Sequence, residues 1–156
     1  SFPTRRSSDL TQTKKTGEPF AQLVSKYGQR ICERIPKYTG YAWDNADPVI
    51  PVYVANMPIA DIFDPLTINV RDDPWQMLIM LIHELCHLNI HLETNDCMRE
   101  ELLEHVLKQI CQDLELHLKT EIAYVDHIIE ERFEGEYHPV DIDVTRETTK
   151  EWLARQ

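Results

Sequence analysis

Residues 72–91 read DDPWQMLIMLIHELCHLNIH and contain the longest apolar run of the chain, Met77 to Ile82. Asp73 and Pro74 are typical of a helix-capping residue and of the first helical position. Apolar residues then occupy nearly every side of the predicted helix in its first half, which indicates that it is buried. We therefore expect a central, buried helix from Trp75 to about His91.

The same helix carries His83-Glu84-Leu85-Cys86-His87, an HExxH pattern. Residues four apart lie on one helical face, so both imidazoles can reach one Zn²⁺ ion. Glu84 is turned about 100° away and can reach a water molecule held by that ion. The pattern predicts His83 and His87 as zinc ligands and Glu84 as general base. The alternative is two core histidines satisfied by hydrogen bonds beside a salt-bridged glutamate.

Sequence patterns on the N-terminal side of this helix predict one helix and two strands. Apolar residues at three- and four-residue spacing predict an amphipathic helix over residues 18–35, and Pro36 is expected to end it. Two runs rich in β-branched residues, Val49–Ala55 and Leu66–Val70, predict strands. Turn-rich segments separate these elements.

The C-terminal side is predicted to be mainly helical. Thr94-Asn95-Asp96 is expected to end the central helix and to cap a second helix over about 97–118. A third helical stretch is predicted for 120–133, followed by a short strand at Val140–Val144 and a terminal helical turn. The expected fold class is α+β, with a small twisted sheet packed against the buried HExxH helix and a helical C-terminal half.

Composition excludes several classes of protein. The 156 residues carry a net charge of −11 with a pI of about 5.0, so no nucleic-acid partner is expected. The longest apolar run is far shorter than the about 20 residues of a membrane span, so no membrane insertion is expected. The cysteines form no CxxC pair, which favours reduced thiols and a cytoplasmic protein; they are Cys32, Cys86, Cys97 and Cys111.

The first ten residues, SFPTRRSSDL, stand apart from the rest of the chain. A codon string that encodes them resembles a widely used sequencing-library adapter, and no initiating Met precedes them. We therefore expect residues 1–10 to be an adapter-derived artefact and residues 11–156 to form a single metalloprotein domain. The native N-terminus is then unknown, and a signal peptide upstream of it stays compatible with the sequence.

Residues 49–110 resemble the zincin metallopeptidase superfamily, most closely the minimal gluzincins found among phage and prokaryotic hypothetical proteins. The resemblance lies in a strand ending TINVR, the segment DPWQMLIMLIHELCH and a glutamate-rich helix after it. It implies zinc binding by His83 and His87 and general-base chemistry by Glu84. One position, Asn89, departs from the zincin pattern, which prefers an apolar residue there.

The resemblance also implies a third ligand from the helix that follows, in the segment REELLEH at 99–105. Glu100 shares a helical face with leucines one and two turns later and should point towards the core. Glu101 shares its face with charged residues and is expected to face solvent. A metzincin-type His is absent at position 93, and His91 lies too far along the helix to join the same ion. We expect Glu100 to be the third ligand; the alternatives left open are Glu101, Glu104 and His105.

These features predict a zinc-dependent hydrolase, a metallopeptidase that uses a metal-activated water with Glu84 as general base on a peptide or protein substrate. A carbonyl-polarising residue is sought on the third helical stretch, among Tyr124, His127 and Arg132. The alternative function is a non-catalytic zincin-fold binding or regulatory module, phage or toxin–antitoxin related, although a structural metal would not require Glu84. A metal-free helical interaction protein is the third possibility.

Overall fold

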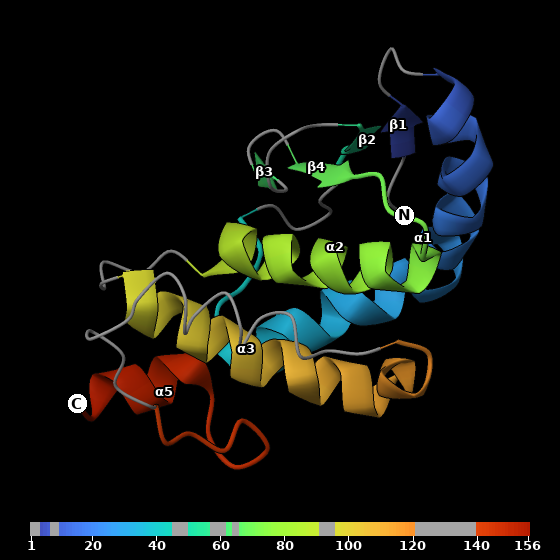
Figure 1. Cartoon of the computed structure of the whole chain (residues 1–156). Coiled ribbons are helices and arrows are strands. Elements are labelled where there is room, and N and C mark those ends of the chain that lie inside the picture. The colour runs from blue at the N-terminus through green and yellow to red at the C-terminus, as the bar shows by residue number, and fades with distance from the viewer. Residues whose placement is uncertain are drawn as a thin grey trace.

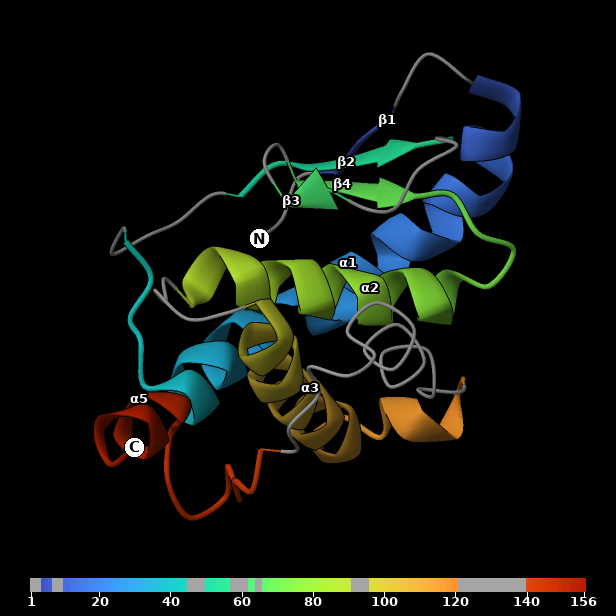
Figure 2. The same cartoon turned by 60° about the vertical axis from the view of Figure 1, so that its left-hand side comes forward.

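The computed structural model describes residues 4–6, 10–44, 50–56, 62–63, 66–90, 96–120 and 140–156. These residues form a small sheet on one side of a central helix, with further helices on its other sides (Figures 1 and 2). The elements in chain order are β1 Thr4–Arg6, α1 Leu10–Thr39, β2 Val52–Ala55, β3 Ile62–Phe63, β4 Leu66–Asn69, α2 Pro74–Asn89, α3 Asp96–Asp113, the 3₁₀ turn η1 Leu116–Leu118, and α5 Thr149–Ala154. The predicted α+β class is confirmed.

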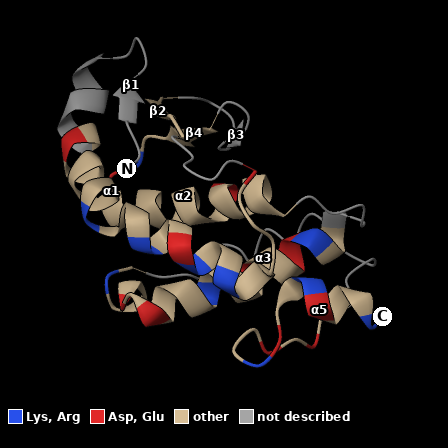
Figure 3. Cartoon of the chain, turned by 180° about the vertical axis from the view of Figure 1, so that it is seen from behind, with Lys and Arg blue, Asp and Glu red and all other residues tan. Residues whose placement is uncertain are grey.

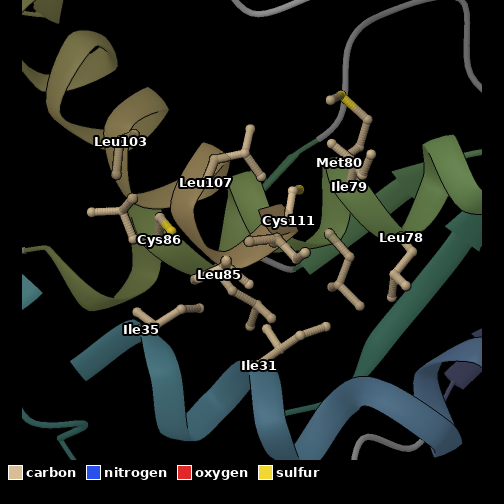
Figure 4. Close-up of a cluster of buried hydrophobic side chains, with 14 of the residues drawn as sticks. Ile31, Ile35, Leu78, Ile79, Met80, Leu85, Cys86, Leu103, Leu107 and Cys111 are labelled. Atoms are coloured by element: carbon tan, nitrogen blue, oxygen red, sulfur yellow. The ribbon is translucent and has the colours of Figure 1, made fainter. Parts of the chain in front are cut away.

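The central helix is α2, as predicted. The Asp73 carboxylate accepts a hydrogen bond from the backbone N–H of Trp75 at 2.9 Å, and Pro74 occupies the first helical position. Every residue from Met77 to Ile82 is buried. Figure 4 shows side chains of α1 and α3 meeting those of α2 in one hydrophobic cluster. The helix ends at Asn89, two residues before the expected end.

The sheet has the strand order β1-β2-β4-β3. Its inner strands β2 and β4 are the two strands expected from sequence, and they run parallel with Val54 opposite Ile68. The outer strands β1 and β3 were not predicted. No element was predicted within residues 1–10, which are expected to be adapter-derived, and the two residues of β3 are too few to show an alternating pattern. β1 pairs in parallel with β2, and β3 is antiparallel to β4. The sheet covers one side of α2, opposite α3 (Figure 1).

Strand β1 falls within the ten residues that we expect to be adapter-derived. Its Arg5 lies opposite Tyr53 in the sheet register, and α1 begins at Leu10. This placement does not bear on where the ten residues come from. Their origin, and the single domain predicted for residues 11–156, stay predictions.

Helix α1 is longer than predicted, and the expected break at Pro36 is wrong. Proline has no N–H to donate to the carbonyl four residues earlier, which is that of Cys32. In the structure the indole Nε1 of Trp43 donates to this carbonyl at 2.9 Å. The helix continues to Thr39, and Gly40 follows it with a φ of 80°, the left-handed conformation that glycine adopts readily.

Replacing Trp43 by Phe is expected to lower the free energy of unfolding by about 1 kcal/mol, because the Cys32 carbonyl then loses its donor. In a Pro36→Ala background a backbone N–H at position 36 can occupy that carbonyl, so the same replacement should cost clearly less. The four free energies come from urea unfolding of the double-mutant cycle. Equal costs in both backgrounds would contradict this role of the indole.

The C-terminal part agrees with the prediction in its helices but not in its strand. α3 and the terminal turn, α5, are present as expected, whereas residues 120–133 lie almost wholly outside the described residues. Val140–Val144 was predicted as a strand, and this is wrong: buried and exposed residues alternate there, but no strand is assigned. The sheet lies on the opposite side of α2 from this segment (Figure 1), so residues 140–144 cannot pair with its strands. Instead, the carbonyls of Val140 and Asp141 accept hydrogen bonds from His105 Nε2 (3.0 Å) and Trp152 Nε1 (2.9 Å).

Exposed charged side chains lie along the outer face of α1. Figure 3 shows both signs of charge along α1, where Lys26, Arg30, Glu33 and Lys37 are exposed. Across the described residues, no helix is both long and apolar enough to cross a bilayer.

Candidate metal centre

The last two turns of α2 bring His83 and His87 together. Their Nε2 atoms lie 3.2 Å apart, and their rings meet at 78° with centroids 4.8 Å apart. Both side chains are mostly buried, with exposed fractions of 15% and 12%. The i, i+4 spacing therefore places two imidazole nitrogens at one point, as the sequence predicted.

Helix α3 brings Glu100 to the same point. Its Oε1 lies 3.0 Å from His87 Nε2, and its Oε2 lies 3.4 Å from His83 Nε2. The beginning of α3 lies against the C-terminal half of α2 (Figures 1 and 2), and Glu100, the fifth residue of α3, faces the two histidines. Among the described residues, this is the one cluster of three metal-ligating side chains.

The donor set fits a zinc ion. A tetrahedral ion with bonds of about 2.0–2.1 Å holds its ligand atoms about 3.3–3.4 Å apart. The two histidine nitrogens are 3.2 Å apart, and two different oxygens of Glu100 lie 3.0 Å from His87 Nε2 and 3.4 Å from His83 Nε2. With one ligand atom taken from each residue, all three lie within 4.8 Å of one another. Two imidazoles and one carboxylate also match a donor set of catalytic zinc sites, which keep their fourth position for water. Occupation of this site by zinc stays a prediction.

Glu84 lies beside these three side chains without belonging to them. One carboxylate oxygen is 4.0 Å from His83 Nε2, and the residue is 7% exposed. A carboxylate this close can reach a water molecule on an ion held by the histidines. Its position therefore suits the predicted role of a base that is not a ligand.

The expectation that Glu101 faces solvent is wrong. Glu101 is 3% exposed, with Oε2 3.7 Å from His105 Nε2, and Glu104 is 5% exposed, with Oε1 2.5 Å from Lys108 Nζ. The prediction treated this face of α3 as open, but the buried Val140 lies beside α3 and accepts a hydrogen bond from His105. Neither glutamate nor His105 joins His83 and His87.

Cys86 lies within the HExxH pattern but belongs to the core. It is fully buried, and Figure 4 shows it in the cluster that also contains Leu103 and Leu107 of α3. Burial raises the pKa of its thiol, which therefore stays protonated. The side chain packs as a small apolar residue.

Asn89, the departure from the zincin pattern, is 1% exposed at the end of α2. Its Oδ1 accepts a hydrogen bond from Thr39 Oγ1 at 2.6 Å, and its Nδ2 donates to the Tyr41 carbonyl at 2.9 Å. A polar residue on a helix predicted to be buried needs hydrogen-bond partners, so these contacts of Asn89 could have been expected from the sequence.

Four residues weighed in the sequence analysis lie outside the described residues: His91, Tyr124, His127 and Arg132. The expectations for them stay predictions. Comparison of the chain with models of known protein families, with curated proteins and with solved structures finds no match.

Proposed function

We propose that this protein is a zinc-dependent hydrolase, and specifically a metallopeptidase acting on a peptide or protein substrate. The observation that carries the proposal is the convergence of His83, His87 and Glu100, with one donor atom of each residue within 4.8 Å of the others. The separation of the two histidine nitrogens, 3.2 Å, agrees with the edge of a tetrahedral zinc site. The HExxH motif supplies the rest of the argument, because it adds a carboxylate beside the ligands.

Zinc bound at such a site acidifies a coordinated water and polarises a carbonyl group. The protein contributes the placement of the two histidines on consecutive turns of α2 and of the carboxylate on α3. Because the three ligand side chains are at most 15% exposed, water reaches them from few directions. Low exposure strengthens the electrostatic interactions within the site.

Glu84 moves the proton in this proposal. Its carboxylate accepts a proton from the attacking water and then delivers it to the nitrogen of the leaving amine. The position of Glu84 one residue after His83, turned off the ligand face, suits this role. A purely structural metal site has no use for such a base, which favours the hydrolase over a non-catalytic binding module.

The purified protein is expected to bind one zinc ion per chain. The measurement is a competition titration with a chromophoric chelator, followed by elemental analysis of the dialysed protein. Hydrolysis of fluorescently labelled casein should stop when a chelator removes the metal and return when zinc is restored. Zinc binding without hydrolysis of any peptide would favour the binding or regulatory module, and no zinc binding would favour the metal-free interaction protein.

A further inference from the structure

We infer that Asn89 is a positioning residue for the metal centre, holding the last turn of α2 so that His87 meets Glu100. The inference rests on the proposed function, because it assumes that His83, His87 and Glu100 bind a metal. It goes further by assigning a role to a residue that is neither a ligand nor a base.

Within the described residues, the side-chain hydrogen bonds of Asn89 lead to one short segment at the end of α1. Thr39 Oγ1 donates to Asn89 Oδ1 at 2.6 Å, and Asn89 Nδ2 donates to the Tyr41 carbonyl at 2.9 Å. Thr39 Oγ1 also accepts from the Tyr41 N–H at 3.2 Å. Asn89 is 1% exposed and Thr39 is fully buried, so water does not compete for these bonds.

Asn89 and His87 project from nearly opposite sides of the same helical turn. At 100° per residue, positions two apart point about 200° from each other. One side chain therefore fixes the turn to α1, while the other reaches Glu100 on α3. Because helix ends open most easily, the turn that carries His87 would otherwise be the least constrained part of α2.

An apolar residue could fill the same space, but it would not fix the position of the turn as two directional hydrogen bonds do. A ligand displaced by about 1 Å is enough to spoil a metal site. α1 makes a comparable contact elsewhere: the Tyr38 hydroxyl donates to the Asp113 carboxylate, at the end of α3 far from Glu100. That second contact provides a matched control.

The test is a Co²⁺ titration of the folded protein, followed through the visible absorption bands of the bound ion, together with urea unfolding. Thr39→Val removes the donor to Asn89, whereas Thr39→Ser keeps the hydroxyl and removes only a methyl group. We expect about tenfold weaker Co²⁺ binding and altered absorption bands in Thr39→Val. Thr39→Ser should bind Co²⁺ as the parent does, although both variants lose stability. Asn89→Leu should weaken binding at least as much as Thr39→Val.

Tyr38→Phe is the control, because it removes one hydrogen bond between α1 and the distant end of α3. It should lower stability and leave Co²⁺ affinity and the absorption bands unchanged. Equal Co²⁺ affinity in Thr39→Val, Thr39→Ser and the parent would overturn the positioning role. A parent protein that binds neither Co²⁺ nor Zn²⁺ would instead overturn the proposed function, so the two failures are distinguishable.

Discussion

Replacing Glu84 by Gln is expected to leave zinc binding nearly unchanged and to reduce hydrolysis by about 10²–10⁴-fold, the usual contribution of a general base. The Gln side chain keeps the size of Glu84 but cannot accept the proton. The carboxylate lies 4.0 Å from His83 Nε2 and outside the three-residue cluster, so zinc should not depend on it. The measurements are the zinc dissociation constant and the rate of casein hydrolysis, each on both proteins.

The companion variant His83→Ala removes a proposed ligand and should lose both zinc and activity. A loss of zinc in Glu84→Gln as large as that in His83→Ala would show that ligand and base have been misassigned. Full activity in Glu84→Gln would show that another group takes the proton. Urea unfolding of both variants separates these outcomes from loss of the folded state.

The central features of this fold were predictable because their signals are local. The Asp73-Pro74 start, the apolar run after it and the i, i+4 pair His83 and His87 all lie within one helix. Each follows from helical geometry and capping without knowledge of the rest of the chain. The parallel strands β2 and β4 were likewise visible as runs of β-branched residues.

What the sequence analysis missed depends on partners far along the chain. Pro36 lies within α1, and Trp43, seven residues later, donates to the Cys32 carbonyl that Pro36 cannot serve. Glu101 is buried on the helix where Val140 accepts a hydrogen bond from His105, and no pattern within the helix reports a neighbour 39 residues away. Buried and exposed residues alternate over 140–144 as in a strand. Its first two carbonyls, however, accept hydrogen bonds from side chains of α3 and α5 and not from a neighbouring strand. In each case tertiary contacts override the local pattern.

The prediction of Glu100 as the third ligand depended partly on a local pattern and partly on a tertiary contact. Its inward direction followed from the leucines on its face, but its meeting with His87 required the chain to reverse between α2 and α3. The structure places Glu100 at 3.0 Å from His87 Nε2, while Glu101, one residue later, points to His105 instead. These adjacent glutamates therefore form a natural comparison of a proposed ligand with a buried non-ligand.

Replacing Glu100 by Gln is expected to weaken zinc binding by more than the about 100-fold that loss of an outer-shell partner costs. The amide carries no charge to balance the cation, and two histidines alone make an incomplete site. Glu101→Gln, on the same turn of α3 and also largely buried, should bind zinc within about tenfold of the parent, because its carboxylate lies outside the cluster. Both affinities come from the same chelator competition. A larger loss in Glu101→Gln than in Glu100→Gln would move the third ligand along the helix, and equal parent-like affinity in both would mean that the carboxylates of α3 do not bind the metal.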